Sequence, residues 1–126
     1  MSLTTQRELL ASTLETGMPD HSVYPDPGTK FSAPCVRINA GAPWIAPSIL
    51  RAGKRTTRWE VWAVAGKLDA EMSLEDLEAM VALATVALDN LAGWSAIQWD
   101  RPALVEMGGA IYLASRGQIE TIAEVT

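Results

Sequence analysis

The fold is decided by residues 57–65, which read TRWEVWAVA. Successive side chains of an extended strand point to opposite faces of a sheet. Both faces carry large apolar side chains here: Trp59, Val61 and Ala63 on one, Trp62 and Val64 on the other. A strand that is apolar on both faces is typical of the centre of a sheet that is covered on both sides. The stretch therefore predicts a central strand.

A long helix is predicted to follow this strand, over residues 73–92. Ser73 is a candidate N-cap, and Glu75 and Asp76 place negative charge in the first turn, where the helix dipole favours it. Apolar residues then recur at steps of three and four, at Leu74, Leu77, Met80, Val81, Ala84, Leu88 and Leu91. This spacing predicts one apolar face directed at the core.

A second, shorter helix is expected before the strand, over residues 4–16. Thr5 and Glu8 have the spacing of a capping box. Leu3, Leu10 and Leu14 form an apolar stripe at helical spacing, and the helix is expected to stop near Gly17.

The C-terminal third indicates β-structure. Strands are expected at residues 94–99, 104–107 and 110–115, and at 119–125 beyond a bulge at Gly117. Gly108-Gly109 is a two-residue hairpin signal, because both glycines tolerate positive φ. The order of elements predicts an α+β fold, a single antiparallel or mixed sheet flanked by two helices.

Residues 19–56 are expected to be mostly irregular, because six of the seven prolines lie in this window. Residues 35–38 are expected to form a short extended piece, with Val36 and Ile38 on one face. Residues 43–47, Pro-Trp-Ile-Ala-Pro, form a stiff aromatic knuckle bracketed by prolines. We expect residues 39–58 to form a proline-rich extended arm or hairpin that protrudes from the domain.

Length and charge narrow the possible functions. A chain of 126 residues suits one domain, here residues 1–126. The net charge of −5 disfavours sequence-independent binding of nucleic acid. Residues 1–58 carry +3 and residues 59–126 carry −8, which indicates opposed electrostatic faces. Such faces favour head-to-tail self-association, and a merely solvated surface is the alternative.

The residues that carry chemistry do not form a recognisable catalytic or metal-binding pattern. Cys35 is the only cysteine and His21 the only histidine, so a zinc site or an internal disulfide is excluded. The acids Asp69, Glu71, Glu75 and Asp76 lack the spacing of a calcium loop. We expect no catalytic residue, no metal and no cofactor. A small enzyme that uses His21 or Cys35 stays open as an alternative.

The first residues and the hydropathy of the chain do not predict a membrane protein. The first residues lack the apolar core of a signal peptide, and no run approaches the ~18 apolar residues of a membrane span. We expect a soluble protein made inside the cell.

A basic run and a tryptophan are the candidate interaction residues. The basic run places four lysine or arginine residues within residues 51–58, and Trp44 precedes it in the proline-rich segment. Tryptophan is enriched at interfaces because it buries a large area with few torsions to freeze. The run is expected to contact an acidic neighbouring subunit or a phosphate backbone, and a solvated loop is the alternative. The candidate interface residues are Trp44, Arg51, Lys54, Arg55 and Arg58.

The order of these signals resembles the tail-terminator proteins of long-tailed bacteriophages, in the form found in phages of actinobacteria. The likeness covers nearly the whole chain and has no catalytic motif in it. It rests on a short leading helix, a proline-rich stretch with Pro43-Trp44, a strand that reads RWEVWAVAG at 58–66, a helix that closes as ALDNLAGW at 87–94, and strands that turn at GGAIYL, 108–113.

The resemblance implies a structural role in the virion. Such proteins form a hexameric ring at the head-proximal end of the tail tube, stop its polymerisation and present a surface to the head–tail connector or stopper protein. The implied partners are other copies of the chain, the tail tube protein and the connector, and genomic DNA passes through the lumen without specific binding. Another neck component, a stopper or completion protein, is the nearest alternative, and a DNA-binding module that acts through residues 51–58 is a more distant one.

Overall fold

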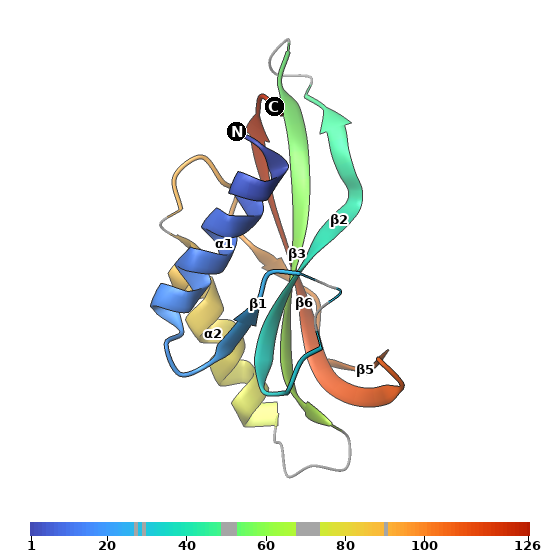
Figure 1. Ribbon diagram of the computed structural model, residues 1–126. Helices are drawn as coiled ribbons and strands as arrows, with labels where there is room; N and C mark the ends of the chain where they lie inside the picture. The colour runs from blue at the N-terminus through green and yellow to red at the C-terminus, as the bar shows by residue number, and fades with distance from the viewer. Residues whose placement is uncertain (27, 29, 49–52, 68–73, 90) are drawn as a thin grey trace.

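The computed structural model describes residues 1–126 except 27, 29, 49–52, 68–73 and 90. Two helices and six strands follow one another along the described chain (Figure 1). In order they are α1 (Leu3–Gly17), β1 (Ser22–Tyr24), β2 (Cys35–Pro47), β3 (Arg55–Lys67), α2 (Leu74–Asp89), β4 (Gln98–Trp99), β5 (Ala103–Met107) and β6 (Ala110–Ala123).

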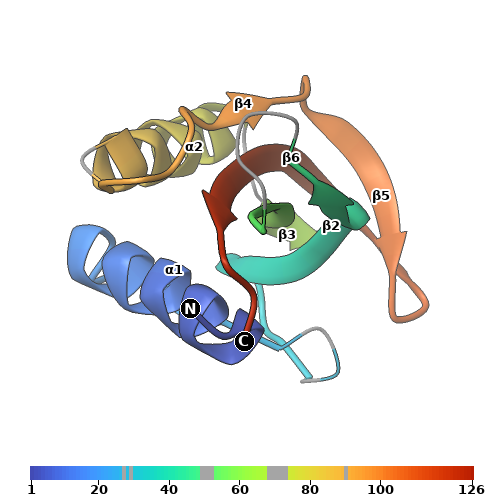
Figure 2. The same cartoon turned by 90° about the horizontal axis from the view of Figure 1, so that it is seen from above.

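The strands form one mixed sheet in the order β1-β2-β3-β6-β4, and β5 also pairs with β6. β1 is parallel to β2, and every other pair is antiparallel. Figure 2 shows the strongly coiled sheet with α1 and α2 side by side against one of its faces. The predicted α+β class, one sheet flanked by two helices, is confirmed.

β3 is the central strand, as residues 57–65 predicted, and it runs two residues further at each end. It pairs with β2 on one side and with β6 on the other. Both of its faces contribute to a core. Trp59, Val61 and Ala63 pack under the helices, whereas Val64 belongs to a second core with Cys35, Tyr112 and Ala114.

α1 buries the predicted leucine stripe but begins earlier than its capping prediction. Leu10 and Leu14 are fully buried. The N-cap is Ser2, whose Oγ accepts a hydrogen bond from the Thr5 backbone N–H at 3.0 Å. The predicted cap at Thr5 is therefore wrong, because Ser2 satisfies the same helix end one turn earlier. Glu8 is exposed on the outer side of the helix.

α2 directs most of its predicted face at the core. Leu77, Met80, Ala84 and Leu88 are buried. Leu74 is 51% exposed and does not join them, because it stands in the first turn of the helix. The predicted N-cap Ser73 lies outside the described residues.

The expectation of an irregular segment over residues 19–56 is wrong, because β2 is a strand of 13 residues. It pairs with β3 from Cys35↔Val64 to Pro47↔Arg55, and the register shifts between Ala40 and Ile45. On the edge of β2 that faces away from β3, β1 pairs only with residues 35–37. Within the described chain, residues 38–47 have no neighbouring strand on that edge, so a missing backbone N–H there breaks no strand pairing. Proline is tolerated at such edges and at bulges, and the predicted arm is an extension of the sheet itself.

The C-terminal strands also differ from prediction. Residues 94–99 form only the short β4 and an isolated bridge from Trp94 to Thr121. β6 runs unbroken through Gly117, so no bulge separates two strands there. A Cβ at this position would lie 2.7 Å from Ile97 Cδ1 and 2.9 Å from the Trp99 ring, so glycine leaves room for these side chains. The predicted turn is confirmed, with φ of 59° at Gly108 and 85° at Gly109.

Candidate interaction surface

The end of the β2–β3 hairpin carries exposed apolar side chains. Trp44 is 40% exposed and packs edge-on against Trp59, with ring centroids 5.8 Å apart. Its neighbour Ile45 is 39% exposed and lies opposite Thr57. The buried Trp59 thus supports an aromatic side chain that stays partly exposed to solvent.

The basic residues at this end do not form one surface. Arg55 and Thr57 share the helix side of β3, because residues two apart on a strand point the same way. Arg58 points to the opposite face, where its Nε lies 3.1 Å from Glu120 Oε2. The candidate set is therefore divided between two faces of the sheet, and Arg51 lies outside the described residues.

Arg55 is the most available of these cations. Lys54 Nζ lies 3.8 Å from Glu124 Oε1, so its charge has an acidic neighbour, as that of Arg58 has. Arg55 is exposed and donates from Nη1 to the Lys54 carbonyl oxygen at 3.0 Å. Within the described chain it has no carboxylate partner. A carboxylate on another molecule can therefore reach it without displacing an internal ion pair.

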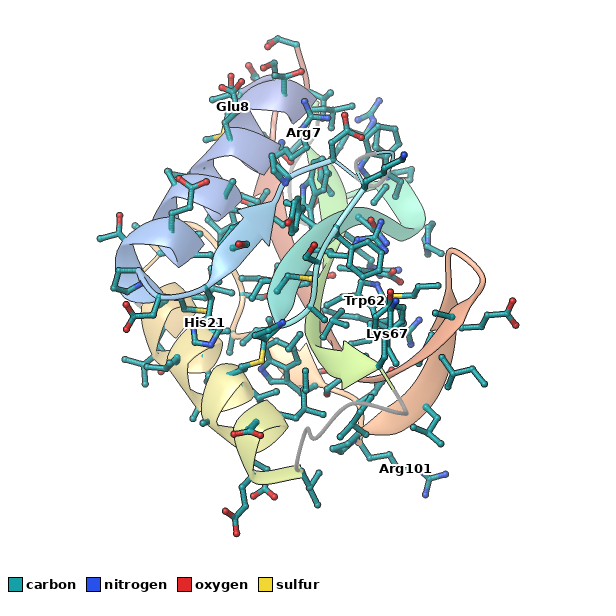
Figure 3. All side chains as sticks on the ribbon, turned by 60° about the horizontal axis from the view of Figure 1, so that its bottom comes forward. Arg7, Glu8, His21, Trp62, Lys67 and Arg101 are labelled. Atoms are coloured by element: carbon teal, nitrogen blue, oxygen red, sulfur yellow. The ribbon has the colours of Figure 1, made fainter. Side chains whose placement is uncertain are left out.

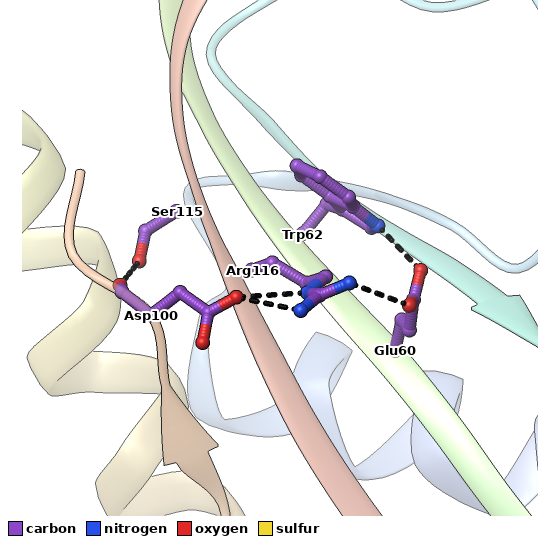
Figure 4. A network of polar contacts seen from close by, with 5 residues as sticks. All are labelled: Glu60, Trp62, Asp100, Ser115 and Arg116. Carbon is purple, nitrogen blue, oxygen red and sulfur yellow. Dashed lines mark hydrogen bonds and ion pairs between the residues drawn. The ribbon is translucent and has the colours of Figure 1, made fainter. Parts of the chain in front are cut away.

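The helix-free face of the sheet holds a network that the sequence did not reveal (Figure 4). Arg116 bridges two strands: Nη1 lies 3.3 Å from Glu60 Oε2, and Nη2 lies 2.8 Å from Asp100 Oδ2. The Trp62 indole Nε1 donates to Glu60 Oε1 at 3.1 Å. These partners come from β3, β6 and the residue after β4, so only the strand pairing brings them together.

The outer face of α2 is the second feature that sequence analysis missed. No charged residue lies between Glu78 and Asp89. Leu83 and Val86 are 44% and 67% exposed, and Ala79 and Ala82 are exposed beside them. The signal was present as a helix that is apolar on nearly all sides, a pattern that usually indicates full burial. Here one face covers the core and the other faces solvent.

A hollow of about 560 Å³ lies on the side of the second core. The Arg37 guanidinium carbon is 4.2 Å from the centre of the Phe31 ring, and its Nη1 donates to Met107 Sδ at 3.6 Å. Lys30 and Tyr112 also line the hollow. Arg37 is half-buried and joins β2 to Met107 at the end of β5, so it contributes to the packing of this side.

Cys35 and His21 are not arranged as a catalytic pair. Cys35 is fully buried, and burial raises the pKa of its thiol to about 11, against a smaller opposite effect from Arg37. The protonated thiol is a poor nucleophile. His21, which is labelled in Figure 3, is half-buried, and its Nδ1 has no hydrogen-bond partner within the described chain. No hydrogen bond joins the two side chains there.

The described residues contain no group of three or more His, Cys, Asp or Glu side chains placed to hold a metal ion. Asp69 and Glu71, two of the four acids that lack the spacing of a calcium loop, lie outside the described residues. Neither described helix is long and apolar enough to cross a membrane.

No protein-family model matches the chain, and no curated protein is significantly similar to it.

Proposed function

We propose that this chain is a structural virion protein that forms a ring at the head-proximal end of a phage tail tube. The ring ends tube polymerisation and joins the tail to the head connector. The order of sequence signals supports this role through its resemblance to tail terminators. The structural observation that supports it best is the hairpin end, where Trp44, Ile45 and Arg55 present apolar area and positive charge on one extension of the sheet.

A ring needs two different complementary patches on each subunit, since a head-to-tail contact joins unlike surfaces. The hairpin end supplies a basic and apolar patch. The acids, eleven of which lie after residue 58, supply negative charge elsewhere. Complementary charge steers such a contact and fixes its register. The net charge of −5 also suits a lumen through which DNA slides, because like charges repel the phosphate backbone.

The proposal is tested by adding the purified chain to tail tubes that grow from the tube protein of the same virus. The expected result is tubes with a ring at one end and no further growth at that end, seen by negative-stain imaging. Arg55→Glu is expected to weaken this capping, while Arg101→Glu leaves it intact. Arg101 is a matched control because it is an exposed arginine on the far side of the fold from α1 (Figure 3). Tubes that keep growing at both ends contradict the proposal.

A further inference from the structure

The outer face of α2 is an exposed apolar surface of the kind that binds another molecule. We call it the α2 patch and define it by Ala79, Ala82, Leu83 and Val86. Val86, at 67% exposure, is the most exposed of the large hydrophobic side chains in the described residues. Beside it, a shallow depression of about 370 Å³ runs between α2 and the last turns of α1. An apolar strip of this kind on a small domain marks a surface that another molecule covers.

The charges around the α2 patch identify its occupant. Glu75 and Glu78 precede it on the helix, Asp89 follows it, and all three are exposed. No basic residue occurs in α2. A matching surface must be apolar at its centre and positive at its rim. The hairpin end, which we define by Trp44, Ile45 and Arg55, carries two exposed apolar side chains beside one exposed arginine, and so complements this patch.

We propose that the α2 patch binds the hairpin end of a second copy of the chain. The hairpin end lies at the top of the molecule in Figure 1, and α2 lies at the lower left. The two surfaces therefore meet only between copies. After one such contact, each pair keeps one hairpin end and one α2 patch unused, so further copies add in the same way until the assembly closes. This inference rests on the proposed ring and names the two surfaces that build it.

Two blocking variants and two matched controls test the pairing. Val86→Glu places a charge on the α2 patch, and Arg55→Glu reverses the charge of the hairpin end. Both side chains are exposed, so the fold is expected to persist, and circular dichroism and thermal melts check it. Each variant alone is expected to weaken self-association at least ~tenfold, because an unpaired charge or a like-charge contact is buried. Leu104→Glu (57% exposed) and Arg101→Glu carry the same substitutions elsewhere and are expected to assemble like the wild type.

The decisive step is to mix the two blocked chains. Val86→Glu keeps an intact hairpin end and Arg55→Glu keeps an intact α2 patch, so the mixture retains one good interface. Sedimentation velocity is expected to show a 1:1 heterodimer that does not grow, whereas each chain alone stays monomeric. A smaller loss of self-association with Val86→Ala than with Val86→Glu supports the same contact.

Three results would overturn the inference. In the first, Val86→Glu assembles like the wild type, or Leu104→Glu is impaired as much as Val86→Glu. In the second, the mixture of blocked chains forms no heterodimer. In the third, the wild-type chain remains monomeric up to ~1 mM, since an interface weaker than this does not hold a ring. The first two results concern this interface alone, so a wild-type chain that still caps tubes would keep the proposed function and lose only the inferred contact.

Discussion

The indole Nε1 of Trp59 donates a hydrogen bond to Oε1 of Gln6 at 3.0 Å, in the core between β3 and α1. Trp59 is 3% exposed and Gln6 is fully buried. The Gln6 Nε2 group has no partner within the described chain. The hydrogen bond to the side-chain oxygen is therefore the polar contact that stabilises this buried glutamine. The same indole packs edge-on against Trp44. Trp59 thus contacts both Gln6 of α1 and Trp44 of the hairpin end.

Gln6→Ala is expected to lower the free energy of unfolding by about 1–3 kcal/mol, because it leaves the Trp59 N–H buried without an acceptor. Urea unfolding measures this. In the background of Trp59→Phe, which has no such N–H, the same substitution is expected to cost less. Equal costs in the two backgrounds would show that the hydrogen bond does not couple α1 to β3.

Arg116→Ala is expected to destabilise the protein by about 1–2 kcal/mol, because Glu60, with a side chain only 14% exposed, loses its ion-pair partner. Lys54→Ala is the control. Lys54 meets Glu124 at 3.8 Å, and the Glu124 side chain is 67% exposed, so this surface pair contributes ~0–1 kcal/mol. Thermal melts at low and high salt compare the two variants. A loss with Lys54→Ala as large as that with Arg116→Ala goes against this account.

Gly117→Ala is expected to cost about 1–3 kcal/mol, since its Cβ would lie 2.7 Å from Ile97 Cδ1 and 2.9 Å from the Trp99 ring. The Trp99 indole is held by a 2.9 Å hydrogen bond from its Nε1 to Thr85 Oγ1, which limits how far the ring can move aside. Gly28→Ala is the control, because the nearest atom to its new Cβ is 3.5 Å away. Denaturant midpoints measure both, and an unchanged midpoint for Gly117→Ala would contradict the packing described at β4.

The buried thiol predicts a pH dependence of stability. The pKa of Cys35 is raised by burial from 9.0 to about 11, so the unfolded chain loses this proton at lower pH than the folded one. The stability that the neutral thiol contributes is thus full below pH 9 and is lost as pH rises toward 11. Cys35→Ala is expected to flatten this decline relative to the wild type in urea titrations at pH 8 to 11. Parallel declines in the two proteins would show that the thiol titrates alike in both states.

The sequence was informative where the hydrophobic period was unambiguous. The two apolar faces of residues 57–65 predicted β3, and the steps of three and four predicted the buried side of α2. The sequence led to wrong predictions where one residue type is compatible with two structures. Proline breaks a central strand but is tolerated on the open edge of β2, and Gly117 suggested a bulge although it makes room for Trp99.

The candidate surface was predictable only in part. Trp44 was identifiable from the sequence as a candidate interface residue, and its side chain is 40% exposed. The separation of Arg55 from Arg58 depends on strand alternation, and the predicted strand began only at residue 57, so it did not include Arg55. The network of Arg116 depends on strand pairing, and the outer face of α2 depends on which sides of the helix the rest of the fold covers.

The central claim, that copies of this chain close into a ring, is tested most directly by native mass spectrometry with negative-stain imaging over a range of concentrations. The account predicts a closed species of about six subunits with an open lumen. A compact dimer at every concentration would contradict it, because a two-fold pair has already used the surfaces that a ring needs.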